Sequence, residues 1–66
     1  MKPSIGRIVH YKLDDGKLVP AIITKVWSET CVNLRVFMDS KEIDHTTSVM
    51  EGEDVGQWVW PERRDI

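Results

Sequence analysis

Apolar and polar residues alternate with a period of two along much of this chain, as they do in strands that bury one face. The clearest stretch is residues 32–37, where Val32, Leu34 and Val36 take every second position. Because side chains at i and i+2 share a face of a strand, this segment turns an aliphatic face inward. Its other face carries three residues of different chemistry: Asn33, Arg35 and Phe37.

Short segments rich in β-branched and aromatic residues predict five strands, and no helical spacing extends over a useful length. The predicted strands span residues 7–11, 20–27, 32–37, 45–50 and 57–60. Asp15 and Gly16 predict a tight hairpin turn after the first, since glycine adopts the positive φ that such turns need. The core is predicted to comprise aliphatic residues of four strands: Val9, Ala21, Ile23, Val26, Val32, Leu34, Val36 and Val49.

Five short strands in 66 residues form a meander whose sheet edges have to be covered. A small closed or partly closed barrel covers them at this length. We therefore predict an all-β fold, a five-stranded SH3-like barrel. It forms a single domain over residues 1–66, with residues 1–6 and 61–66 as tails.

The chain has a net charge of −2, from nine basic and eleven acidic residues mixed along its length. It therefore lacks the basic field that drives binding to duplex nucleic acid. No segment approaches the roughly 18 apolar residues of a membrane span, so no membrane partner is expected. Cys31 is the only cysteine, which favours a reducing compartment and a small buried hydrophobe over a reactive thiol. A chain this short buries only about 60% of its unfolded surface, which favours a homo-oligomer.

Trp58 and Trp60 are two residues apart, so a strand places both indoles on one face. Two interpretations of these indoles stay open. They form part of an aromatic core, or they join Tyr11 and Trp27 in a platform on which a base stacks. Because Val59 between them is small and β-branched, we expect the indoles on the packed side with their edges at its rim.

Isolated cations suggest a second feature, a site for phosphate. Arg7 with His10 or Tyr11, depending on register, is suited to charge-assisted bonds to phosphate, although a solvated strand face explains the same residues. Arg35 shares its row with an amide and a phenyl ring, which suits nucleotide recognition or a subunit interface. The two histidines, His10 and His45, lack acidic residues at metal-binding spacing, so no metal site is expected.

Several segments in order resemble a known group of proteins: residues 6–11, the turn at Asp15 and Gly16, residues 20–23, Val26 with Trp27, residues 32–34, Val36 with Phe37, residues 47–49 and residues 58–62. This pattern is similar to that of small orphan proteins of bacteriophage and prophage genomes, which look like SH3-type barrels. Many members carry His where Val59 stands and a longer insertion after Phe37. The resemblance implies a fold and a phage context, in the cytoplasm of a bacterial host, but no settled activity.

The sequence contains no nucleophile–base pair and no glycine-rich phosphate loop, which favours a binding protein without cofactor over an enzyme. In the phage context, we expect a sponge that sequesters a cyclic nucleotide or cyclic ADP-ribose immune signal between protomers. The alternative is an SH3-like protein-interaction or virion accessory module that binds a host protein. The predicted ligand-binding residues are Trp58, Trp60, Tyr11, His10, Arg7 and Arg35.

Overall fold

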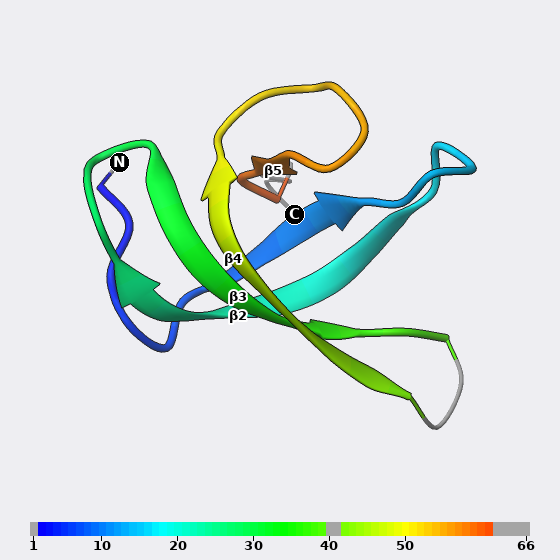
Figure 1. Ribbon diagram of the computed structural model, residues 1–66, viewed down its shortest axis with the longest axis horizontal. Coiled ribbons are helices and arrows are strands. Elements are labelled where there is room, and N and C mark those ends of the chain that lie inside the picture. Colours follow the sequence, from blue (N-terminus) through cyan, green and yellow to red (C-terminus); the bar gives the residue numbers. More distant parts are fainter. Residues whose placement is uncertain (1, 40–41, 62–66) are drawn as a thin grey trace, which may run out of the picture.

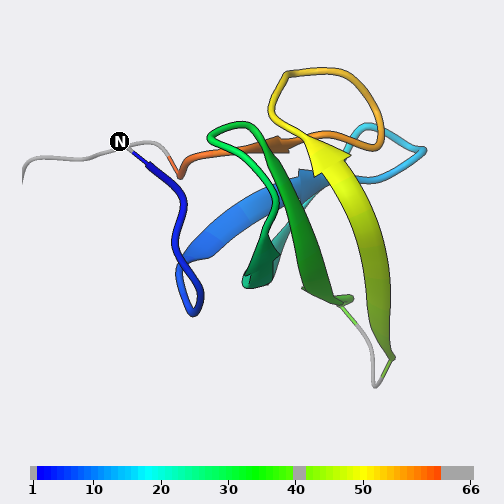
Figure 2. The same ribbon diagram turned by 60° about the vertical axis from the view of Figure 1, so that its left-hand side comes forward.

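Strands form where β-branched and apolar residues concentrate, and all of them join one sheet (Figure 1). The computed structural model describes residues 2–39 and 42–61. The strands are β1 (Ile8–Lys12), β2 (Leu18–Val26), β3 (Cys31–Phe37), β4 (Ile43–Met50) and β5 (Trp58–Val59). They lie in the order β4-β3-β2-β1-β5, and every neighbouring pair is antiparallel. The sheet curls into a half-barrel, so the five-stranded all-β prediction is confirmed (Figure 2).

The predicted strand boundaries differ from the observed ones mainly in β2, β4 and β5. β2 begins at Leu18 and so contains Pro20, although proline cannot donate to a ladder. Pro20 forms a non-hydrogen-bonded pair with His10 of β1, because the hydrogen-bonded pairs of this ladder include Leu13 with Lys17 and Arg7 with Ile23. It also lies beyond Ala21, the last β2 residue paired with β3, so its missing N–H interrupts neither ladder. β4 starts two residues earlier than predicted and β5 has only two residues. Residues 62–66 of the predicted tail 61–66 lie outside the described residues, as do residues 40–41 of the turn before β4.

The turn between β1 and β2 forms at the predicted Asp-Gly pair. Gly16 has a φ of 86°, a value that side-chain-bearing residues rarely adopt. Its N–H donates to the carbonyl of Leu13 at 2.9 Å, and the N–H of Lys17 donates to the carboxylate of Asp15 at 3.0 Å. The tight hairpin predicted there is therefore present.

The core lies on the concave face of the curled sheet. Seven of the eight residues predicted for it are buried, and Val26 is only half-buried and packs against them. Val26 follows a register shift in β2 between Ile23 and Lys25, which carries it toward the margin of the core. The structure adds Val19, which the prediction omitted. It also adds Trp58, which was absent from the predicted core residues although its indole was expected on the packed side of its strand, as it is.

The segment after β4 crosses one end of the half-barrel and brings β5 against β1. The Gly52 N–H donates to the carbonyl of Trp58 at 2.9 Å, and Glu51 forms a single bridge with Trp58. The Trp58 indole N–H donates to the carbonyl of Thr30 at 3.1 Å. These contacts join the last strand to the turn before β3 and so close this end of the barrel.

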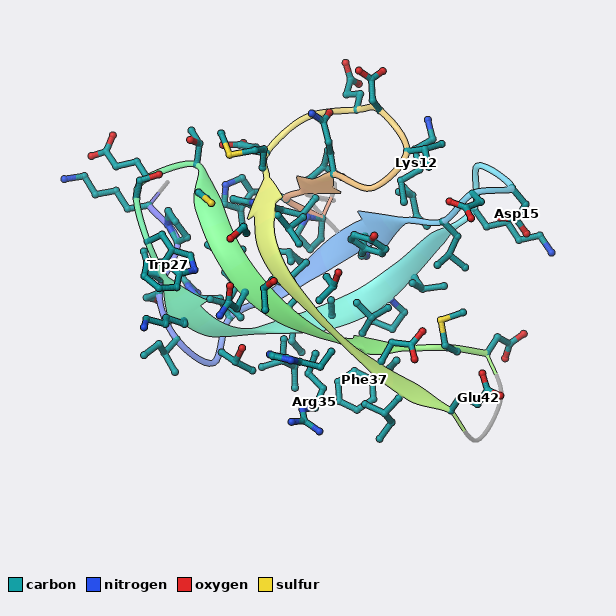
Figure 3. All side chains as sticks on the ribbon, in the orientation of Figure 1. Lys12, Asp15, Trp27, Arg35, Phe37 and Glu42 are labelled. Carbon is teal, nitrogen blue, oxygen red and sulfur yellow. The ribbon has the colours of Figure 1, made fainter. Side chains whose placement is uncertain are left out.

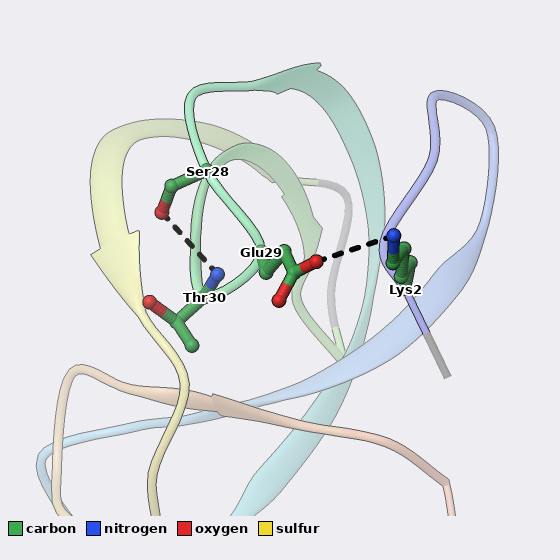
Figure 4. Close-up of polar contacts among 4 residues, drawn as sticks. All are labelled: Lys2, Ser28, Glu29 and Thr30. Carbon is green, nitrogen blue, oxygen red and sulfur yellow. Dashed lines mark hydrogen bonds and ion pairs between the residues drawn. The ribbon is translucent and has the colours of Figure 1, made fainter.

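The turn between β2 and β3 is organised by the side chain of Ser28 (Figure 4). Its Oγ accepts hydrogen bonds from the backbone N–H of Thr30 at 3.3 Å and of Cys31 at 3.1 Å. Lys2 and Glu29 form an ion pair of 3.3 Å beside it, but both are exposed, so the pair adds little stability. Cys31 itself is half-buried, so its prediction as a buried hydrophobe is wrong in degree: it occupies the outward row at the start of β3.

Candidate binding surface on the outer face of the sheet

The convex side of the sheet, opposite the core, is called the outer face here. Residues paired directly across antiparallel strands point to the same side, so the register assigns each strand residue to a face. Arg35 and Phe37 project from β3 away from the enclosed core (Figure 3). The outer face consists of Ile8, His10, Lys12, Leu18, Pro20, Ile22, Lys25, Cys31, Asn33, Arg35, Phe37, Ile43, His45, Thr47, Met50 and Val59.

The outer face contains no aspartate or glutamate, although the protein is acidic overall. Apart from Cys31, its ionisable residues are all basic: Lys12, Lys25, Arg35, His10 and His45. The described carboxylates lie in the segments that connect the strands, except for Asp44, which is paired with the core residue Val36 and therefore belongs to the inner side of β4. Basic and acidic residues are mixed along the chain, but in the folded protein the outer face carries only basic ones.

A row of four residues crosses the middle of this surface. Ile8 pairs with Ile22, Ile22 pairs with Arg35, and Arg35 pairs with His45. The Cβ atoms of paired residues lie roughly 4.5–5.5 Å apart. Arg35 therefore lies between the two isoleucines on one side and the imidazole of His45 on the other. Ile8 is 56% exposed, and Ile43 in the neighbouring row is 52% exposed. Scattered exposed apolar residues are ordinary, but several on one face form a patch that a partner can cover.

The three aromatic residues predicted to bind a ligand lie on the opposite side. Trp58 is completely buried, so its prediction as a stacking surface is wrong for the single protomer: it fills the core of a barrel with few other large side chains. The two indoles are adjacent, as predicted, and pack edge to face with centroids 5.3 Å apart. Trp60 and Tyr11 are half-buried against the core.

Tyr11 borders a hollow of about 410 Å³ at the open end of the barrel. Leu13 and Met38 contribute apolar walls, and the remaining lining residues are carboxylates: Asp14, Asp15 and Asp44. Negative charges repel phosphate, so this hollow does not have the chemistry predicted around Tyr11. Of the predicted cations, His10 and Arg35 lie on the outer face, and Arg7 is exposed just before β1. One protomer therefore does not bring the six predicted residues together.

Asn33 has a structural role that its place in the outward row did not reveal. Its Oδ1 accepts hydrogen bonds from the Trp27 indole N–H at 2.8 Å and from the Ser48 backbone N–H at 2.9 Å. Ser48 has a φ of 54° where the β3–β4 register shifts, so Asn33 supports a bulge in β4. Lys25 lies 3.9 Å above the ring of Trp27. The side-chain amide of Asn33, which the sequence suggested for nucleotide recognition, therefore uses its oxygen for hydrogen bonds within the protein.

Searches of family models, curated proteins and solved structures gave no match to this chain. In the described part of the chain, no helix has the length and apolar character needed to cross a membrane. Within residues 2–39 and 42–61, no three His, Cys, Asp or Glu side chains gather in a group that could hold a metal ion.

Proposed function

We propose that this chain is a non-catalytic binding module and that the outer face of its sheet holds an acidic surface of a protein partner. The observation that carries this proposal is the absence of carboxylates from a face that presents Arg35 and His45 beside exposed isoleucines. Complementary charge selects and orients a partner, and the central apolar contacts supply most of the affinity.

The row through Arg35 has the composition of an interaction centre. Ile8, which is 56% exposed, and the half-buried Ile22 flank the guanidinium on one side. Complete burial of a fully exposed isoleucine contributes about 1.5–3 kcal/mol, and covering the remaining exposed surface of these two contributes part of that. A hydrogen bond from arginine to a partner carboxylate adds about 1.5–3 kcal/mol. Arginine is also enriched among residues that dominate binding energy. We therefore place the centre of the interface at Arg35.

A bacterial host protein in the cytoplasm is the partner that the resemblance to phage proteins suggests. The phage origin and the compartment belong to this proposal. A partner with an acidic, partly apolar surface satisfies the chemistry of the outer face whichever host protein it belongs to.

A phage sponge for a cyclic nucleotide or cyclic ADP-ribose signal is the second candidate. It is favoured by one observation: His10, Arg35 and Phe37 share the acid-free face, so phosphate and base contacts are available together. A single protomer presents these residues on an open sheet surface. Such a ligand would accordingly be held between two protomers, as the sequence also suggested.

Capture from bacterial lysate, with charge-reversal variants, separates these candidates. Arg35→Glu places a carboxylate at the centre of the face, whereas Lys17→Glu makes the same charge change in the β1–β2 turn. We expect a captured protein to be lost with Arg35→Glu and retained with Lys17→Glu. Equal loss of the captured protein from both variants would mean that the interaction depends on net charge alone, which would contradict the proposal. No captured protein, together with a thermal shift in a panel of cyclic nucleotides, would replace it with the sponge.

A further inference from the structure

β4 forms one end of the sheet, and no strand within residues 2–39 and 42–61 pairs with its outer edge. It has eight residues, whereas β5 at the other end has two. Figure 2 shows β4, in yellow-green, as the outermost strand beside β3. Unpaired edges of this length are ready templates for another strand.

The register identifies which backbone groups of β4 are open. The N–H of Met38 donates to the carbonyl of Glu42 at 3.3 Å, and hydrogen-bonded pairs in an antiparallel ladder recur at every second residue. Asp44 and Thr46 therefore direct their backbone groups toward β3. Ile43 and His45 form the alternate, non-hydrogen-bonded pairs with β3, so their N–H and C=O groups point to the open side.

Residues 43–47 carry few of the features that usually protect an edge. This stretch contains no lysine and no proline; its one protective feature is Asp44, a single inward-pointing charge, and the pairing proposed below sets it opposite an uncharged threonine. Further protection begins only at Ser48, where the bulge held by Asn33 interrupts the strand. The usable edge therefore extends from Ile43 to the residue before Ser48.

We infer that β4 pairs in antiparallel orientation with β4 of a second copy, about a two-fold axis at His45. The unpaired N–H and C=O groups of β4 occur at every second residue. Two copies can therefore form hydrogen bonds only if an open residue of one copy lies opposite an open residue of the other. Centring the pair on His45 places Ile43 opposite Thr47 of the second copy, a favourable β-branched pair on the outer face. It also places Asp44 opposite Thr46, which avoids two facing carboxylates.

A second copy suits this edge better than a flexible peptide does. Its β4 is already ordered as a strand and has the same unsatisfied groups, so pairing satisfies two edges and orders no new segment. The two sheets become continuous, and their acid-free faces lie side by side. This assembly goes beyond the proposed function and does not depend on it.

Light scattering with size-exclusion chromatography tests the pairing on three proteins. His45→Ala removes the imidazole but keeps the backbone N–H, whereas His45→Pro removes both. We expect the wild type and His45→Ala to have twice the 7.7 kDa mass of the chain. Each copy of His45→Pro loses one inter-strand bond, so its dissociation constant should exceed that of His45→Ala by on the order of tenfold or more. A monomeric wild type, or equal constants for the two variants, would overturn the inference.

Amide hydrogen exchange of the wild-type protein gives an independent test in case His45→Pro does not fold. Raising the protein concentration should protect the amides of Ile43 and His45, which the monomer leaves open. The amide of Thr46, which already faces β3, should change little and serves as the internal control. Exchange at Ile43 and His45 that is independent of concentration would also overturn the inference.

Discussion

Trp58 and Trp27 offer a direct comparison of one residue type in two environments. Trp58 is completely buried, packs edge to face against Trp60 and donates its indole N–H to Thr30 at 3.1 Å. Trp27 is 56% exposed and contacts Lys25 and Asn33 on the opposite side of the sheet. Replacing each by alanine should therefore have very different effects on the free energy of unfolding.

The expected magnitudes follow from these contacts. Trp58→Ala should cost about 3–5 kcal/mol, the range for deleting a buried aromatic side chain. A domain of 66 residues is stable by only about 3–10 kcal/mol, so this variant should be barely folded or unfolded. Trp27→Ala loses an exposed cation–π contact and one hydrogen bond, which together contribute about 1–2 kcal/mol.

Urea unfolding followed by far-UV circular dichroism measures both values. Trp58→Phe is the intermediate variant. It keeps an aromatic ring but loses the hydrogen bond to the Thr30 carbonyl, which still accepts from the Glu51 N–H at 2.8 Å, and it leaves space where the larger indole packed, at a combined cost of about 1–3 kcal/mol. We expect the order of stability Trp27→Ala, Trp58→Phe, Trp58→Ala, from most to least stable. If Trp58→Ala were no less stable than Trp27→Ala, the placement of Trp58 in the core would be refuted.

Two further substitutions test the packing of β3 and the bulge of β4 by the same assay. Leu34→Ala, at a buried position of β3, should lower the unfolding free energy by about 2–5 kcal/mol, and a loss below about 1 kcal/mol would place Leu34 at the surface. Asn33→Ala removes the acceptor of two hydrogen bonds, from the Ser48 N–H and from the Trp27 indole N–H, and should cost about 1–3 kcal/mol at about 0.5–1.5 kcal/mol each. Asn33→Asp keeps an acceptor oxygen and should recover part of that loss; equal losses would mean that the hydrogen bonds are not what stabilises the bulge.

The inner face of the barrel could be predicted because it depends on local alternation. The period of two in residues 32–37 places Val32, Leu34 and Val36 inward, and all three are buried. The adjacency of Trp58 and Trp60 follows from the same rule. Which face of β5 turned inward was less certain, because that depends on bonds to Thr30 and Gly52, far away in the sequence.

The outer face could not be predicted, since it exists only once the register of the sheet is known. Ile8, Ile22, Arg35 and His45 belong to four different strands, and nothing in their sequence spacing sets them in one row. The same holds for Asn33, whose role depends on a bulge in the neighbouring strand. Net charge was misleading for a similar reason, because it averages a basic sheet face with acidic turns.

Methyl NMR of protein labelled at isoleucine and methionine tests the central proposal most directly, with the captured partner added in steps. The outer face carries Ile8, Ile22 and Ile43, whereas Ile23 is buried and Ile5 lies before β1. We expect the three outer-face methyl signals to shift or broaden as the partner binds, with Ile23 and Ile5 changed little. Unperturbed outer-face methyls, with shifts confined to the methyl of Met38 at the acidic hollow, would contradict the proposal and move the binding site to the open end of the barrel.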